Sequence, residues 1–181
     1  PLAAVYDPVR RRSFFSVLGA TAARLVEYDG ITVIDHGAIP LFATELTADT
    51  ARGRLIAIGI DTASTAGVVE WDGAGWIQPA LPARPSAQIV QCAAYDENRN
   101  VTVAMLTNPA QASETWEWNG TVWALRRTEG VLQFGRFAYD PVRRKVVTAE
   151  FAVTQSGARA WNGTFWTTYT SQVQGDVAIG L

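Results

Sequence analysis

An eight-residue phrase returns four times along the chain, and it constrains the fold more than any other feature. The phrase reads VEYDGITV at 26–33, VEWDGAGW at 69–76, WEWNGTVW at 116–123 and RAWNGTFW at 159–166. The aromatic residue before the turn therefore recurs after 43, 47 and 43 residues. Such a period, roughly 40–50 residues, is typical of a chain that stacks equivalent small units.

Each phrase predicts a β-hairpin. Asn119-Gly120 stands between two short aromatic-rich arms, and Asn and Gly are the residues that best tolerate the positive φ of a type I′ turn. We expect a two-residue loop that pairs Trp116 with Trp123 on one face. Aromatic cross-strand pairs of this kind stabilise a hairpin by roughly 0.2–1 kcal/mol relative to alanines.

A second phrase repeats in step with the first and predicts another hairpin. It is VYDPVRR in the first repeat, and its aspartates recur after 42, 47 and 44 residues, at Asp7, Asp49, Asp96 and Asp140. The Asp side chain can cap the turn, Pro presets φ, and the arginines remain in water. We expect these arginines to be solvated turn residues, partly paired with the nearby aspartates.

Together the two phrases predict four strands per repeat. In the third repeat we expect strands near 89–95, 101–106, 115–118 and 122–126, and no window shows a sustained helical stripe. We therefore predict an all-β, single β-propeller domain over 1–181. Its approximate repeats are 1–38, 39–82, 83–128 and 129–170, and 171–181 resembles the first strand of a fifth. A closed four-bladed ring is favoured by the chain length, and an arc of a larger propeller is the alternative.

The motifs resemble a known repeat family. An aromatic-Asp-Pro-x-Arg-Arg turn, an apolar second strand and Glu-Trp-Asp-Gly-x-x-Trp are similar to the bacterial kelch-like repeats of β-propellers. The resemblance covers nearly the whole chain and implies four kelch-like, four-stranded blades, but it implies no particular activity. The chain departs from the kelch pattern where a Gly-Gly pair ends the second strand, because the matching positions include Ile58-Gly59 and Met105-Leu106.

The composition of the chain argues against several classes of function. The net charge of −2 argues against a protein that coats nucleic acid, and no apolar run approaches the roughly 20 residues of a membrane helix. Cys92 is the only cysteine and His36 the only histidine, so a two-histidine metal site is excluded. We expect Cys92 to be a buried strand residue, and we expect no cofactor. We leave the compartment open, with a bacterial extracellular or periplasmic one favoured.

The blade layout separates two ends of the molecule. The hairpin turns share one end, and longer, more varied loops share the other, where binding residues usually lie. We assign the repeated tryptophans to packing between blades. The candidate ligand-binding residues are polar groups near the starts of the inner strands: Glu45, Arg84, Gln91, Gln133, Arg136 and Asp176.

Three functions follow from this layout. We favour a non-catalytic propeller that binds a protein or a glycan through the loops at one end. The first alternative is a lyase or glycoside hydrolase, in which Glu45, Asp61 and Asp176 meet across the channel. The second is a structural subunit whose copies associate as a homo-oligomer through open blade edges.

Overall fold

The computed structural model describes residues 2–80, 84–130, 134–151 and 156–170, and within these ranges the chain forms strands and no helix. There are four antiparallel sheets of four strands, each in simple chain order. Sheet A consists of β1 (Ala3–Asp7), β2 (Arg12–Leu18), β3 (Ala23–Tyr28) and β4 (Val33–Ala38). Sheet B consists of β5 (Phe42–Asp49), β6 (Arg54–Ile60), β7 (Ala66–Trp71) and β8 (Trp76–Ile77). Sheet C consists of β9 (Ile89–Asp96), β10 (Val101–Thr107), β11 (Ser113–Trp118) and β12 (Trp123–Glu129). Sheet D consists of β13 (Phe134–Asp140), β14 (Lys145–Phe151), β15 (Ser156–Trp161) and β16 (Trp166–Thr170).

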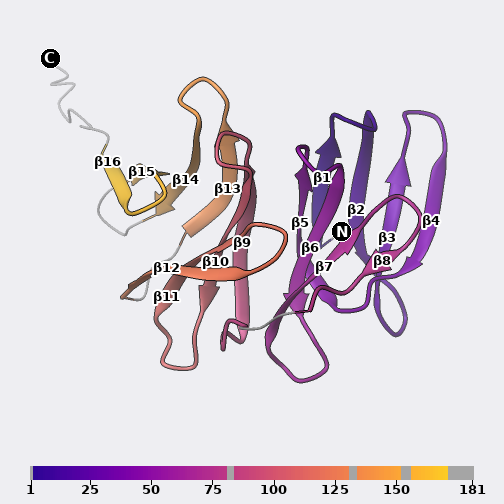
Figure 1. The fold of residues 1–181 in the computed structure, drawn as a ribbon, viewed down its shortest axis with the longest axis horizontal. Coiled ribbons are helices and arrows are strands. Elements are labelled where there is room, and N and C mark those ends of the chain that lie inside the picture. Colours follow the sequence, from indigo (N-terminus) through magenta and orange to yellow (C-terminus); the bar gives the residue numbers. More distant parts are fainter. Residues whose placement is uncertain (1, 81–83, 131–133, 152–155, 171–181) are drawn as a thin grey trace, which may run out of the picture.

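The sheets are the blades of a β-propeller, which confirms the predicted fold class. The first strands β1, β5, β9 and β13 lie next to one another in that order, and the other strands of each sheet extend outward from them (Figure 1). Sheets A and D lie at opposite ends of the long axis (Figure 1). Clusters of buried apolar residues join A to B, B to C and C to D, and none among the described residues joins D to A. The described residues thus form an arc of four blades. The predicted fifth first strand, 171–181, lies outside them.

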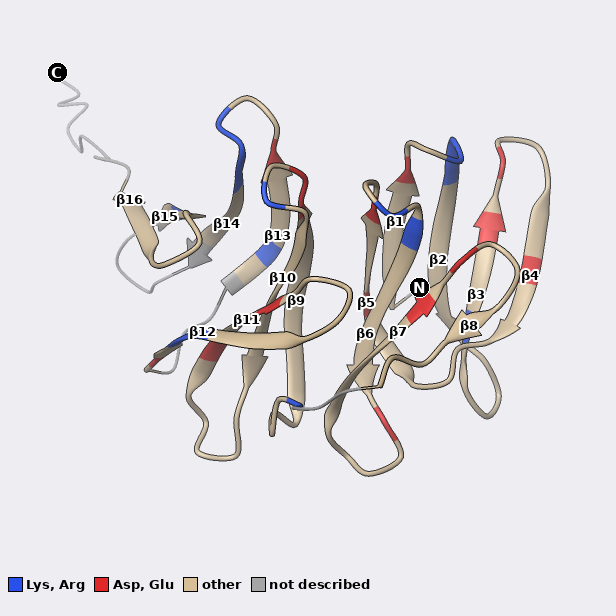
Figure 2. Cartoon of the chain, in the orientation of Figure 1, with Lys and Arg blue, Asp and Glu red and all other residues tan. Residues whose placement is uncertain are grey.

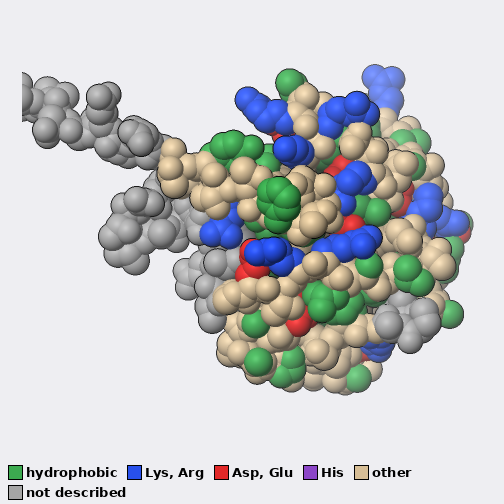
Figure 3. Space-filling view, turned by 60° about the vertical axis from the view of Figure 1, so that its left-hand side comes forward, with side chains coloured by type: hydrophobic (Ala, Val, Ile, Leu, Met, Phe, Trp, Pro, Cys, Tyr) green, Lys and Arg blue, Asp and Glu red, His purple; other side chains and the backbone are tan. Residues whose placement is uncertain are grey.

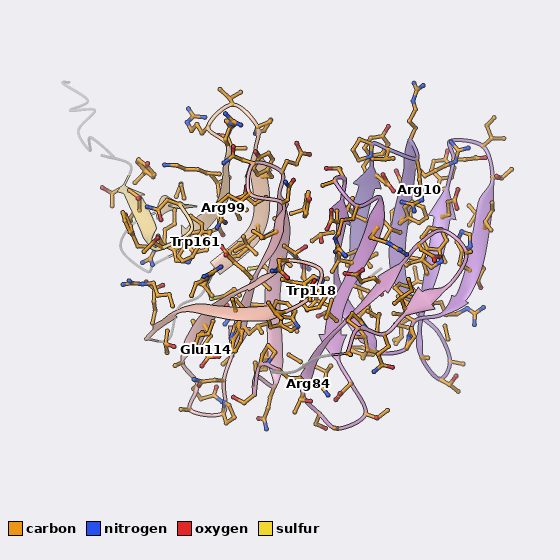
Figure 4. The ribbon with its side chains drawn as sticks, in the orientation of Figure 1. Arg10, Arg84, Arg99, Glu114, Trp118 and Trp161 are labelled. Carbon is orange, nitrogen blue, oxygen red and sulfur yellow. The ribbon has the colours of Figure 1, made fainter. Side chains whose placement is uncertain are left out.

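The repeated tryptophans pack between blades, as expected. Trp71 joins the cluster between sheets A and B, Trp118 the cluster between B and C, and Trp161 the cluster between C and D. Figure 4 shows Trp118 and Trp161 in these positions. Trp118 and Trp161 are fully buried, so each contributes a large apolar area to the joint that it fills.

A chain of polar contacts accompanies Trp118 and Trp161. The Arg52 guanidinium lies 2.7 Å from Asp49 Oδ2 in its own turn and 2.7 Å from Glu70 Oε1. Glu70 Oε1 also accepts a hydrogen bond of 2.8 Å from Nε1 of Trp118 in the next blade. We call this arrangement the Asp-Arg-Glu-Trp chain. It recurs one blade later, and its members there are Asp96, Arg99, Glu117 and Trp161.

The hairpin loops differ from the prediction. Trp118 pairs with Trp123, so the loop contains four residues and not two, and Trp116 pairs with Leu125, next to a bulge between Thr115 and Trp116. The Asn119 side chain explains the difference, because its Oδ1 accepts hydrogen bonds of 2.9 Å from the amides of Thr121 and Val122. This side-chain cap replaces the type I′ turn. Positive φ is then needed at Gly120, where it is 93°, but not at Asn119.

Gly120 should therefore be the most sensitive position of its loop. A Cβ there would lie 2.5 Å from the Arg52 guanidinium and would meet an unfavourable backbone conformation. We expect Gly120→Ala to lower the free energy of unfolding by about 1–3 kcal/mol in urea titrations. Gly75→Ala is the matched control, because Gly75 has open space around it and no positive φ. Equal losses in the two variants would contradict this account.

Candidate functional site: an axial cavity

The structure brings two of the predicted site residues together. Glu45 on β5 and Arg136 on β13 form an ion pair and hydrogen bond, although 91 positions separate them in sequence. The two strands belong to sheets B and D, so the pair reaches past β9 of the intervening blade. A bulge in β5 between Ala43 and Glu45 interrupts the regular register just where the acid is needed.

The pair lines a cavity of about 520 Å³ along the inner strands. All four blades contribute to its wall. Its aromatic lining residues are Tyr6, Tyr95, Phe137 and Tyr139, and its polar ones include Thr47, Thr50 and Glu97 besides the Glu45–Arg136 pair. This combination of apolar wall and few polar groups is typical of sites for small organic molecules.

Burial controls the electrostatics of Glu45. Its side chain is only 8% exposed, and desolvation raises its pKa to about 7 in spite of the Arg136 charge and a hydrogen bond from the backbone of Ala93. The neighbouring Cys92 is a free, buried cysteine, as predicted. Burial, and then the charge of Glu45, raise the pKa of its thiol, so Cys92 is not a nucleophile at neutral pH.

The other candidate residues lie elsewhere. Arg84 binds Asp61, with 2.5 Å between Nη2 and Oδ2, in a separate hollow of about 200 Å³. In Figure 4, Arg84 lies at the end of the molecule opposite to Arg10 and Arg99. Gln91 donates a hydrogen bond of 2.6 Å to Thr107 Oγ1 within its own sheet. Gln133 and Asp176 fall outside the described residues.

Several arginines of the turns pair with nearby aspartates, as we expected. Arg10, Arg99 and Arg143 each bind the aspartate three positions earlier, and Arg54 lies 3.3 Å from Asp72. Figure 2 shows the resulting mixture of basic and acidic residues at the turn end of the molecule. This end is therefore not a purely basic surface.

Sequence reasoning missed the aromatic wall of the cavity. Tyr6, Tyr95 and Tyr139 each precede a turn aspartate of the second repeated phrase, so the signal was present in three of the four repeats. Side chains of the innermost strands face the axis as well as the neighbouring blade. Which of them line the axial cavity becomes clear only from the arrangement of the blades.

Two further findings concern metal sites and membrane spans. Within the described ranges, no three His, Cys, Asp or Glu side chains gather closely enough to hold a metal ion. In the same part of the chain, none of the elements is a helix of the length and hydrophobicity needed to cross a bilayer.

Comparisons with known proteins show the fold. No family model matches the chain, and no curated protein matches it, so the kelch-like repeat type is not confirmed. Among solved structures, the chain is similar to the SapL1 lectin in complex with α-methyl fucoside, at 15% identity and a TM-score of 0.62, over 90% of this chain and 58% of that one. It is similar to a fucose lectin from Kordia zhangzhouensis in complex with methyl fucoside, at 16% identity and a TM-score of 0.51, over 70% of this chain and 99% of that one.

A third similar structure is a protein–protein assembly. The chain is similar to a chain of the nidogen/laminin complex, at 10% identity and a TM-score of 0.67, over 89% of this chain and 60% of that one. The protein thus spans somewhat less than two thirds of the length of SapL1 and of the nidogen/laminin chain. At these identities the comparisons establish that the chain has a β-propeller fold.

The raised pKa of Glu45 predicts a specific pH dependence of stability. The folded protein binds an extra proton between pH 4.5, the ordinary value, and about 7. The stability that Glu45 contributes is therefore fully present below pH 4.5 and is lost as the pH rises through 7. We expect the unfolding free energy of Glu45→Gln, measured in urea, to vary less over this window than that of the unmodified protein. Glu97→Gln is the control and should keep the original slope.

Proposed function

We propose that this protein is a non-catalytic, glycan-binding propeller and that the axial cavity holds the sugar. The observation that carries the proposal is the cavity itself, in which aromatic rings and the ion pair of the buried Glu45 carboxylate with the exposed Arg136 guanidinium face the same space. A pyranose has apolar C–H faces and a rim of hydroxyl groups, so it needs both kinds of partner in one small site.

The individual residues fit these two roles. Tyr6 and Tyr139 offer partly exposed rings whose faces are apolar and whose hydroxyl groups bond to water or ligand. Glu45 accepts hydrogen bonds and Arg136 donates them, and bonds to charged groups contribute about 1.5–3 kcal/mol each. The Arg136 side chain is 70% exposed, so it can reach a ligand without leaving a buried position.

The positions of the acids favour binding over glycoside hydrolysis. Hydrolysis requires two carboxyl groups roughly 5–10 Å apart across the scissile bond. Asp61, one predicted partner of Glu45, pairs with Arg84 away from the cavity. Glu97 does line the cavity, but it lies in the turn that follows β9, whereas Glu45 accepts a hydrogen bond from the backbone of Ala93 within that strand.

The lectins among the similar structures support the proposal and suggest the first ligand to test. Both are named as complexes with a methyl fucoside. A protein partner is the other interpretation, and the nidogen/laminin complex is its precedent among the similar folds. The enclosed shape of the cavity favours a glycan over a protein as the ligand, because protein partners usually need a broader, flatter surface.

A glycan array followed by calorimetric titration tests the proposal. We expect binding of a small set of glycans, with methyl fucoside titrated first. Arg136→Ala should weaken binding by about tenfold or more, because it removes a charged hydrogen-bond donor. Tyr139→Leu should weaken it by about tenfold, because it removes a ring but keeps apolar volume.

The control is Arg127→Ala, since Arg127 pairs with Glu129 on the outer strand of sheet C. Its affinity should match that of the unmodified protein. An array with no bound glycan, or equal affinities in all three variants, would remove the axial cavity as a sugar site.

A further inference from the structure

Every joint between neighbouring blades uses the same two parts. The earlier blade supplies a turn arginine, and the later blade supplies a loop glycine against which that arginine lies. A Cβ at Gly73, Gly120 or Gly163 would come within 3.5, 2.5 or 2.8 Å of the side chain of Arg10, Arg52 or Arg99 respectively. Figure 4 shows Arg99 beside Trp161 in the joint between sheets C and D.

At the ends of the arc, one turn arginine and one loop glycine lack such a counterpart among the described residues. On sheet D, Arg143 pairs, within the described ranges, only in its own turn, with Asp140, and its side chain is 74% exposed. On sheet A, Gly30 has the positive φ of the other loop glycines, at 102°, but a Cβ there would meet nothing within 4 Å. Sheet D thus presents the first half of a joint, and sheet A presents the second half.

The two faces are also apolar where they would meet. In sheet A, Val5 and Phe14 pack toward sheet B, so the alternating residue Phe15 and its cross-strand partner Val26 face away from the arc. Tyr28, which replaces the repeated tryptophan, is 41% exposed. The outward face of sheet D carries a hollow of about 630 Å³ lined by Val147, Ala158, Ala160 and Tyr169, together with Asp140 and Arg143. Figure 3, which brings the left side of Figure 1 forward, shows exposed hydrophobic side chains flanked by basic ones.

A paired change in sequence matches the two faces to each other. In the B–C and C–D joints, a buried glutamate of the earlier blade accepts a hydrogen bond from the indole of the later blade. Sheet D has Ala160 at the glutamate position, and sheet A has Tyr28 at the tryptophan position. The Tyr28 hydroxyl donates to the carbonyl of Gly30 over 2.8 Å, so it needs no glutamate across a joint. Sheet D therefore lacks the glutamate acceptor, and sheet A, which would face it, lacks the indole donor.

We propose that sheet A of one copy of this chain docks on sheet D of a second copy, with Tyr28 over the hollow and the Gly30 loop against Arg143. Within one arc these faces lie at opposite ends and do not meet each other (Figure 1), and the matched changes at Ala160 and Tyr28 favour a second copy as the partner. The new joint continues the A–B, B–C and C–D series. Because the contact is head-to-tail, successive copies form a ring if the rotation closes. This interface does not depend on the glycan proposal, since the sugar site lies in the axial cavity.

Sedimentation equilibrium over a concentration series tests the interface. We expect the weight-average mass of the unmodified chain to rise with concentration from the monomer value of 19.6 kDa toward an integer multiple of it. Arg143→Glu and Tyr169→Glu should each shift the association constant by tenfold or more toward the monomer. Arg144→Glu, which makes the same charge change in the same turn, should leave association unchanged. Near-UV circular dichroism confirms that each variant is folded.

A pair of compensating substitutions provides a more specific test of the interface. Ala160→Glu alone should weaken association, because its carboxylate faces a tyrosine that cannot donate to it. Adding Tyr28→Trp should restore association, because the pair then matches the B–C and C–D joints. A monomer at every concentration, or oligomers unaffected by both Arg143→Glu and Tyr169→Glu, would overturn the proposal. Failure of the double variant to recover would overturn the assigned register.

Discussion

The buried carboxylates between the blades determine the rest of this structure. Glu70 and Glu117 lie almost fully out of water, which is costly for a charged group unless it is paired and hydrogen-bonded. Each is satisfied from two directions, by an arginine of its own blade and by the indole of the next blade. A blade shifted along its neighbour would break the indole hydrogen bonds to these buried carboxylates. The polar contacts therefore define one register for packing that apolar side chains alone would specify loosely.

That register positions the cavity. Because the joints hold neighbouring blades in one relation, the inner strands present their side chains to a common axis, and Glu45 meets Arg136 from two blades further along. The binding groups are thus carried by strands and not by the varied loops. A site on the most constrained part of the scaffold needs little ordering when a ligand enters, which favours affinity at small contact area.

Much of the fold was predictable because its determinants are local. The Asp-Pro turns, the Asn-Gly and Asp-Gly loops and the two-residue alternation of the strands each occupy a few adjacent residues. The hairpin register was harder, because Asn119 could either enter a type I′ turn or cap the amides beyond it, and both conformations suit the same residues. The packing of Trp118 and Trp123 against each other accompanies the longer loop.

The sequence by itself determined the repeat, the strands and the burial of the tryptophans, because periodic patterns record which side of each strand meets apolar neighbours. Only the tertiary structure decided which polar groups meet. Glu45 and Arg136 are 91 residues apart, and Glu70 reaches Trp118 across 48. Contacts between blades depend on the angle and offset at which sheets pack, and no local pattern encodes that geometry. Arg84 and Glu45 looked equivalent in the chain, yet the packing of the blades places one with Asp61 and the other at the axis.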